Sequence, residues 1–128
     1  MVTHITKGIK ISVNTFFQGT FFKENKLHYA FQYCISIENQ SSDSVQLKTR
    51  HWIISESLND KEKVNGEGVV GLKPVIKPGE SHNYKSGCLL KSPYGSMRGH
   101  YKMINLNNTK KFNVIIPSFK LSAPFALN

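Results

Sequence analysis

The sequence predicts an all-β fold, a fibronectin type III or immunoglobulin-like β-sandwich of about seven antiparallel strands. Apolar and polar residues alternate in several segments, which is the period of a strand with one buried face. No segment carries the 3.6-residue apolar spacing of an amphipathic helix. Turn formers separate the alternating segments, as in an antiparallel sandwich. With 128 residues, the chain is long enough for one domain, 1–128, with its own core.

Three strands are predicted in the first half of the chain. Residues 8–17 place three apolar side chains on one face, Ile9, Ile11 and Val13. Residues 29–39 alternate most regularly, with a buried face of Tyr29, Phe31, Tyr33, Ile35 and Ile37. Residues 45–54 alternate less regularly. One face carries Val45, Leu47, Thr49, His51 and Ile53, and the other carries Gln46, Lys48, Arg50, Trp52 and Ile54. Because only the short polar loop NQSSDS joins the last two segments, we expect them to lie near each other and pair antiparallel.

Three more strands are predicted in the second half. In 81–90, His82, Tyr84 and Cys88 alternate with polar positions. The aligned apolar residues are Met97, Tyr101 and Met103 in 96–105, and Phe112, Val114 and Ile116 in 110–121. Pro117 is expected to end or bend the last strand, because proline cannot donate a ladder hydrogen bond. A type II turn is predicted at 77–80, where Pro78 presets φ and Gly79 supplies the positive φ.

The glycines of VNGEGVVG, residues 64–71, have the G-x-G-x-x-G spacing of a dinucleotide-binding fingerprint. That fingerprint requires an apolar strand before the glycines and a helix after them. Here the approach is charged, and Pro74 and Pro78 follow closely, so a helix cannot continue. We therefore expect Gly66, Gly68 and Gly71 to shape a loop or bulge at a strand edge. The alternative is a small anion held by the loop amides.

The net charge of +9 raises the question of nucleic-acid binding. However, 15 of the 17 basic residues are lysines, and they are scattered from Lys7 to Lys120. Scattered lysines are typical of a solvated surface, whereas base and phosphate recognition favours clustered arginines. The sequence therefore makes a nucleic-acid partner unlikely.

The run Arg50-His51-Trp52 is the strongest candidate site. In a strand, Arg50 and Trp52 share a face and His51 points the other way. A packing interpretation buries Trp52 or stacks it under Arg50, and hydrogen-bonds His51 in or near the core. The functional alternative is a pocket in which Arg50 binds an anion, with Trp52 as a wall and the glycine amides beside it.

Catalytic and metal-binding patterns are not evident in the sequence. The five histidines lack metal-ligand spacing, and Cys34 and Cys88 have no C-x-x-C partner, so we expect free thiols, no metal site and no cofactor. Ser96, Arg98 and His100 would share a strand face without a carboxylate to orient the histidine. The acidic residues suggest no catalytic pair. The sequence therefore predicts a protein that is not an enzyme.

Four segments resemble the ApaG family of small bacterial proteins. They are VQLKTRHWIIS, VNGEGVVGLKPVIKPGESHNYKSGC, GSMRGHYKM and FNVIIPSFKLSAP, in the family's order between about Ile11 and Pro124. The resemblance implies a fibronectin type III-like sandwich in which the G-x-G-x-x-G belongs to the family's own pattern. The chain departs from the family in SESLNDKEK, 55–63, which lacks a glycine where the family turns through one.

The resemblance also implies an association with cobalt resistance and magnesium efflux. Similar domains in eukaryotic F-box proteins and in a polymerase-interacting protein imply a protein-interaction module. The alternative is a binder of pyrophosphate, a nucleotide polyphosphate or another small anion through Arg50, His51, Trp52, Gly66, Gly68 and Gly71. No signal peptide or membrane-spanning run is evident, so we expect a cytoplasmic protein without membrane insertion. Exposed sheet edges could also pair two copies into a homodimer.

Overall fold

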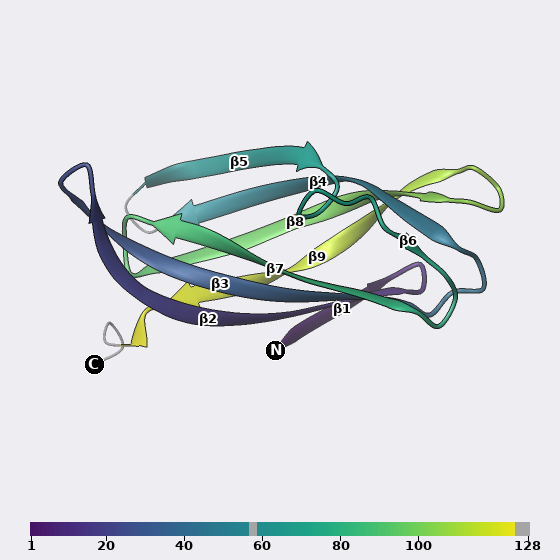
Figure 1. The fold of residues 1–128 in the computed structure, drawn as a ribbon, viewed down its shortest axis with the longest axis horizontal. Helices are drawn as coiled ribbons and strands as arrows, with labels where there is room; N and C mark the ends of the chain where they lie inside the picture. The colour runs from purple at the N-terminus through teal and green to yellow at the C-terminus, as the bar shows by residue number, and fades with distance from the viewer. Residues whose placement is uncertain (57–58, 125–128) are drawn as a thin grey trace.

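Two antiparallel sheets face each other in the computed structural model, which describes residues 1–56 and 59–124, residues 59 and 60 by their backbone alone (Figure 1). The first sheet has the order β1 (Val2–Thr6), β2 (Ile9–Lys23), β3 (Lys26–Asn39), β7 (Ser81–Leu90). The second has the order β5 (Asn59–Glu67), β4 (Val45–Glu56), β8 (Tyr94–Asn105), β9 (Lys111–Ser122), and β6 (Val75–Ile76) also pairs with β4. The predicted β-sandwich is confirmed.

Every strand predicted from alternation is present, and the described residues form three further strands, β1, β5 and β6. These three are edge elements. β1 is mostly exposed, β5 is rich in charged residues, and β6 has two residues. A strand that buries no continuous face leaves little alternation to detect, which explains why the sequence predicted about seven strands instead of nine. The turn between β4 and β5, where the family glycine is missing, includes residues outside the described ranges.

The predicted pairing of 29–39 with 45–54 is wrong. β3 pairs with β2 and β7, whereas β4 pairs with β5, β6 and β8 in the opposite sheet. The loop between β3 and β4 crosses the sandwich, and the fully buried Asn39 fixes it there. Its side-chain amide donates to the carbonyl oxygens of Asp43 and Ile76, both at 2.8 Å. The bond to Ile76 reaches the opposite sheet, and the bond to Asp43 holds the loop.

The predicted buried face of 45–54 is correct only as far as Leu47. The pairing of β4 with β8 shifts register between Leu47 and Thr49, and such a shift reverses which side chains face the core. Trp52 is therefore buried and Ile54 packs against the core. A similar shift near Pro117 bends β9 without ending it, so Ile116 is buried before the shift and Phe119 after it.

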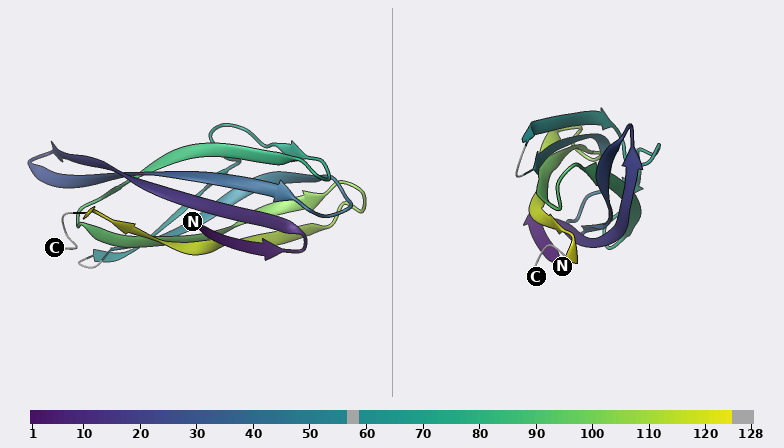
Figure 2. Two further views of the ribbon diagram at one scale, coloured as in Figure 1. Left: turned by 90° about the horizontal axis from the view of Figure 1, so that it is seen from below. Right: turned by 90° about the vertical axis from the view of Figure 1, so that its left-hand side faces the viewer.

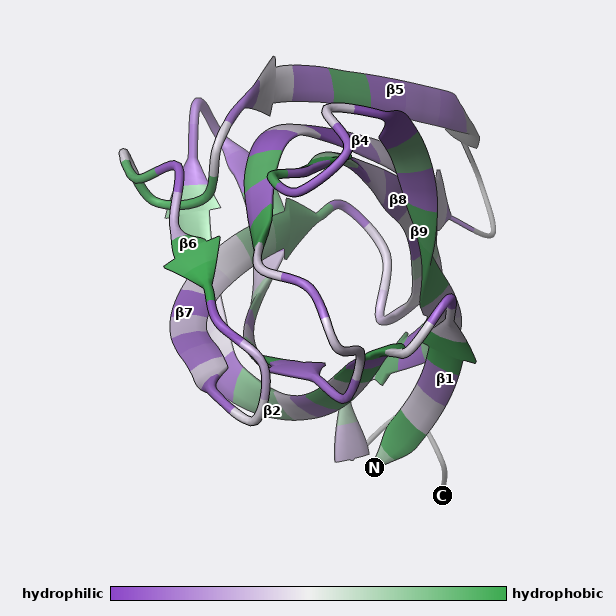
Figure 3. Ribbon diagram, turned by 90° about the vertical axis from the view of Figure 1, so that its right-hand side faces the viewer, coloured by the Kyte–Doolittle hydropathy of each residue, from purple (hydrophilic) through white to green (hydrophobic). Residues whose placement is uncertain are grey.

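The core fills the space between the sheets. It consists of the inward-facing residues of β2, β3, β4, β7, β8 and β9 together with Val69, Ile76 and Ala123. Seen end on, hydrophobic and hydrophilic residues alternate along the strands (Figure 3). Cys34 and Cys88 are free thiols, as predicted. Nowhere in the described ranges is there a helix long and apolar enough to cross a membrane.

The two ends of the sandwich differ. The hairpin of β2 and β3 extends beyond the other strands at one end (Figure 2). The opposite end gathers the turn between β1 and β2, the loop between β3 and β4, and the loop between β8 and β9 (Figures 1 and 3). These two ends, together with the edge where β7 faces β4, contain the surfaces that could bind a partner or ligand.

Candidate functional site

A small pocket, here called the Arg50 pocket, lies where β7 faces β4 and the loop that follows β5. Its volume is about 190 Å³. The lining residues are Tyr33, Arg50, Trp52, Val69, Val70, Tyr84, Lys85 and Ser86. The structure thus brings the predicted Arg50 and Trp52 together in one pocket, beside the glycine loop. Lys85 adds a second cation that sequence spacing did not connect with Arg50.

Arg50 is bound to the glycine loop through carbonyl groups. Its Nη1 donates to the backbone oxygens of Glu67 at 2.8 Å and Gly68 at 2.9 Å. Gly66 pairs with Arg50 in the sheet and leaves room for the guanidinium, because a Cβ on Gly66 would lie 2.5 Å from Nη2. These hydrogen bonds therefore hold the end of β5 and the start of the following loop against β4.

The glycines form a tight hairpin beyond β5, as predicted for a loop at a strand edge. Val69 and Leu72 exchange two backbone hydrogen bonds, of 2.8 and 3.0 Å. The two residues between them have positive φ, 47° at Val70 and 77° at Gly71, which is the geometry of a type I′ turn. At Gly68, φ is 60° and a Cβ would lie 2.1 Å from the Leu72 oxygen. The amides of Gly68, Val69 and Leu72 already donate to backbone carbonyls.

Aromatic groups form the inner wall of the Arg50 pocket. The Trp52 ring packs 5.5 Å from Tyr33 and 5.8 Å, edge on, from Phe119. The hydroxyls of Tyr84 and Tyr101 are hydrogen-bonded to each other. Burial raises the pKa of both these tyrosines and of Tyr33. Their hydroxyls therefore stay protonated at neutral pH.

His51 points away from Arg50 and Trp52, as predicted, but it lies on the outer face of β4 and not in or near the core, because of the register shift near Thr49. It does not reach the Arg50 pocket. Its ring nitrogens are hydrogen-bonded to Thr49 Oγ1 and Asn65 Oδ1, both at 2.9 Å. It stacks on His100 of β8 with ring centroids 4.6 Å apart. Burial lowers the pKa of His100, and His51 and Lys102 lower it further. His51 is therefore separated from the other predicted site residues.

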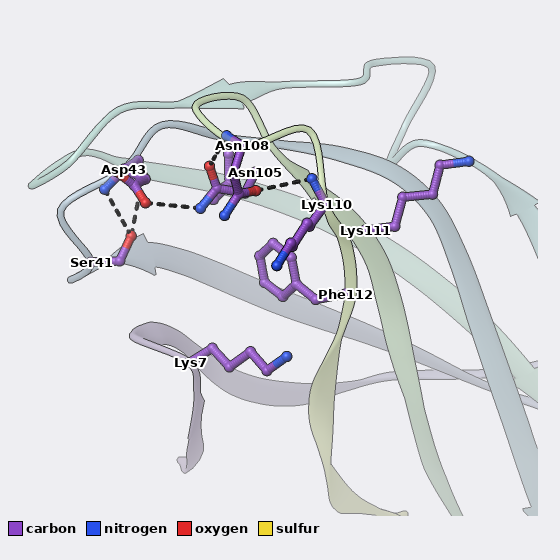
Figure 4. Close-up of a pocket in the computed structure, with 9 residues that line it drawn as sticks. Lys7, Ser41, Asp43, Asn105, Asn108, Lys110, Lys111 and Phe112 are labelled. Atoms are coloured by element: carbon purple, nitrogen blue, oxygen red, sulfur yellow. Dashed lines mark hydrogen bonds between the residues drawn. The ribbon is translucent and has the colours of Figure 1, made fainter.

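A second pocket, here called the loop-end pocket, was missed from the sequence (Figure 4). It is about 270 Å³ in volume. The lining residues are Lys7, Ser41, Asp43, Val45, Asn105, Asn108, Lys110, Lys111 and Phe112. They come from three loops that are distant in the sequence and from the adjoining ends of β4, β8 and β9. Only the adjacent lysines at 110 and 111 were a visible signal.

Exposed apolar side chains cover both faces of the projecting hairpin of β2 and β3 and are here together called the hairpin surface. By the strand register, Phe16, Phe21 and Leu89 of the neighbouring β7 lie on one face, and Phe22 and Leu27 lie on the other. Phe22 is 75% exposed and Phe16 is 50% exposed. Phe22 pairs with Leu27 across the hairpin, and Phe21 stacks on His28. Lys23 and Lys26 pair at the tip and flank the exposed Glu24 in the turn, so the tip that borders the apolar side chains carries a net charge of +1.

The sheet order and the register define this chain as a small antiparallel β-sandwich domain with loops gathered at one end. Residues 20–105 match the ApaG domain. The chain belongs to the ApaG family.

Similar proteins support this assignment along the whole chain. A Protein ApaG of Anaeromyxobacter dehalogenans is 38% identical over 128 residues, 100% of both chains. A Protein ApaG of Shewanella halifaxensis is 39% identical over 127 residues, 99% of this chain and 100% of that one. The names of these relatives state no enzymatic activity.

Solved structures match the fold closely. The X-ray structure of structural-genomics target SoR45 is 36% identical, with a TM-score of 0.86 over 91% of this chain and 88% of that one. The putative ApaA protein from Bordetella pertussis is 36% identical, with a TM-score of 0.80 over 91% and 94%. The predicted family resemblance is confirmed.

Proposed function

We propose that this protein is a non-catalytic, cytoplasmic binding domain whose main partner is another protein. The observation that carries the proposal is the hairpin surface, where large apolar side chains project into solvent. Surface apolar groups of this kind, gathered on one element, mark interaction sites more often than scattered ones do. Aromatic residues also dominate the binding energy of many protein interfaces.

The charge around the hairpin surface indicates which charge the partner's binding surface should carry. Lys23 and Lys26 pair at the tip of the hairpin, and the whole chain carries a net charge of +9. Two copies meeting through this surface would bring their lysines together and repel each other. A different protein with an apolar groove and an acidic rim fits the surface better than a second copy does.

The test is a pull-down from a soluble extract of the source organism, with wild type and with Phe16→Ser/Phe22→Ser as bait. Both side chains are at least half exposed, so their loss should change stability little. Val75→Ser/Leu106→Ser is the matched control, because it removes two exposed apolar side chains elsewhere. We expect one stoichiometric protein to bind the wild type and the control but not the hairpin variant.

Two results would contradict the proposal. One is retention of the same protein by the hairpin variant. The other is repeated recovery of no stoichiometric partner. Light scattering of the wild type checks self-association: we expect a monomer, and a dimer lost in the hairpin variant would assign the surface to a homodimer instead.

A second candidate function is supported by the Arg50 pocket, namely binding of a small anion such as pyrophosphate or a nucleotide polyphosphate. Arg50 and Lys85 line it together with the hydroxyl residues Tyr33, Tyr84 and Ser86, a combination that suits a phosphate group. Unchanged affinity for pyrophosphate in Lys85→Gln would remove this pocket from consideration. His51 is no longer included in this candidate, because it lies on the opposite face of β4.

We further propose that the family's link to cobalt resistance and magnesium efflux acts through the protein partner. No group of three histidine, cysteine or acidic side chains is placed to hold a metal within the described part of the chain. Calorimetry should show no heat with Mg²⁺ or Co²⁺. Saturable binding of either ion would favour a direct role.

A further inference from the structure

We infer that the loop-end pocket is a binding site for small anions with two or more negative charges. This site is separate from the hairpin surface and from the Arg50 pocket. Three lysines line it, and Asp43 is its one acidic lining residue. The pocket therefore carries an excess of positive charge. Because it is concave, the positive electrostatic potential is concentrated where the ammonium groups can also donate hydrogen bonds to an anion.

The frame of the pocket is held rigidly by hydrogen bonds. Asn39 Oδ1 accepts from the backbone amide of Ser41 at 2.9 Å and from its hydroxyl at 2.6 Å. The Gln40 amide donates to the Gly8 oxygen at 2.7 Å. A Cβ on Gly8 would lie 3.0 Å from the Ser41 Cβ, so the turn between β1 and β2 packs closely on the loop between β3 and β4.

The loop between β8 and β9 is fixed to the same frame. The Leu106 amide donates to the Ser44 oxygen at 2.9 Å. Asn105 Oδ1 accepts from the amide of Asn107 at 2.9 Å. The amide of Lys110 donates to Asn108 Oδ1, also at 2.9 Å. A preformed pocket loses less entropy when a ligand binds.

Asp43 is hydrogen-bonded to asparagines, and with its charge counted the lining residues of the pocket carry a net charge of +2. One of its carboxylate oxygens accepts from Asn105 Nδ2 at 2.9 Å, and the other accepts from Asn107 Nδ2 at 2.5 Å. The carboxylate is thus turned toward asparagine amides. Among the side chains that the structure describes, the salt bridge found joins Lys73 to Glu67, and neither residue lines this pocket.

Lys7 and Lys110 are the two cations that reach into the pocket. Lys7 occupies a two-residue turn with φ of 48°, followed by Gly8 at 81°, which presents its side chain at the turn tip. Its Nζ lies 5.7 Å from the centre of the Phe112 ring. Figure 4 shows Lys110 extending toward Phe112, while Lys111 points away. Lys7 and Lys110 are therefore expected to bind the anion directly, with Lys111 adding charge at the rim.

The chemistry favours a small anion such as a diphosphate or a tricarboxylate. Lysine ammonium groups bind phosphate as point charges and do not require the planar geometry that arginine does. Two ammonium groups from separate loops fit a ligand with charges on separate groups. Pyrophosphate and citrate are suitable probes, because they share multiple charges but differ in having phosphate or carboxylate groups.

The test is an NMR titration of ¹⁵N-labelled wild-type protein with pyrophosphate and with citrate, at constant ionic strength set by chloride. We expect shifts confined to the amides of 7–8, 41–44 and 105–112. Lys7→Gln/Lys110→Gln should weaken binding by about tenfold or more. The matched control is Lys91→Gln/Lys120→Gln, which removes the same charge from exposed positions at the other end, and its affinity should stay within about twofold of the wild type.

Three results would overturn the inference: no saturable shifts with either anion, shifts centred on Arg50 and Lys85, or equal weakening in both double variants. Tighter binding of pyrophosphate would indicate that the pocket takes phosphate compounds, and tighter binding of citrate would indicate that it takes carboxylates. The variant Phe16→Ser/Phe22→Ser should bind both anions as the wild type does. Failure of the protein-partner proposal would therefore leave this result unchanged.

Discussion

The Arg50 pocket and the loop-end pocket both contain cations, but the cations differ in what already binds them. Arg50 donates two hydrogen bonds to backbone oxygens, and Gly66 leaves room for its guanidinium. Lys7 and Lys110 line a pocket whose one lining carboxylate accepts hydrogen bonds from asparagine. The first cation stabilises the fold, whereas the other two are available to a ligand.

The comparison shows that residue type alone does not identify a binding site. Arginine beside a glycine-rich loop suggested phosphate recognition, yet Arg50 Nη1 binds the loop's carbonyl groups. Scattered lysines suggested an ordinary solvated surface, yet folding brings Lys7, Lys110 and Lys111 into the lining of one pocket. The partners of each charged group decide whether it is structural or free to bind.

The largest expected effect concerns the loop that Arg50 binds. Gly68→Ala should destabilise the protein by about 3 kcal/mol, because it combines a positive φ with overpacking against a backbone carbonyl. Gly71→Ala is the control, since Gly71 also has positive φ but nothing lies within 4 Å of its added Cβ; its cost should be about 1 kcal/mol. Urea unfolding measures both. Equal losses would show that packing at Gly68 is unimportant.

The next effect concerns Arg50 itself. Arg50→Ala should lower the free energy of unfolding by about 2 kcal/mol, because charged hydrogen bonds to two carbonyl groups are lost. Arg50→Lys should recover little, since an ammonium group cannot reproduce the planar fork. Full recovery by lysine would mean that charge alone matters at this position.

A smaller effect is expected as the pH falls, from His100 on β8, which stacks on His51 of β4. Burial beside His51 and Lys102 lowers the pKa of His100 in the folded protein. The unfolded chain, with a histidine pKa of about 6.5, therefore binds more protons as the pH falls through that value. Stability should drop from pH 7.5 toward the lower folded pKa.

His100→Gln should reduce this pH dependence, and urea unfolding at pH 7.5 and 5.5 measures the change. His4→Gln is the control, because His4 is exposed on β1. An unchanged pH dependence in His100→Gln would show that other groups cause it.

The smallest expected effect is at the loop-end pocket without an anion. Lys7→Gln/Lys110→Gln should change the free energy of unfolding by less than about 0.5 kcal/mol, because both side chains are exposed. Thermal unfolding in a chloride buffer tests this expectation. A loss comparable to that of Arg50→Ala would make these lysines structural and would remove the contrast between the pockets.

The sequence predicted the sandwich because its central strands bury one face each, and Ile35, Tyr101 and Val114 illustrate that alternation well. It failed at β5, where a charged edge strand buries little, and at β4, where the register shift near Thr49 reverses the faces. Neither a register shift nor an edge leaves a periodic signal.

The candidate sites were predictable only in part. Arg50 and Trp52 are two residues apart on one strand, so alternation placed them together. Lys85 joins them from the facing sheet, and Lys7 lines the loop-end pocket together with Lys110. The predicted antiparallel pairing of β3 with β4 failed because the buried Asn39 bonds across the sandwich. Such long-range juxtapositions depend on topology, which local spacing does not encode.

The central claim is that Arg50 stabilises the fold whereas Lys7 and Lys110 bind the anion. The most direct test is urea unfolding of Arg50→Lys and of Lys7→Gln/Lys110→Gln, each with and without pyrophosphate. Saturation near 100 times the dissociation constant should add about 2.7 kcal/mol to the wild type. We predict that Arg50→Lys starts lower but gains the same increment, whereas the double lysine variant starts at the wild-type value and gains almost nothing. The reverse pattern, with the increment lost only in Arg50→Lys, would contradict the account.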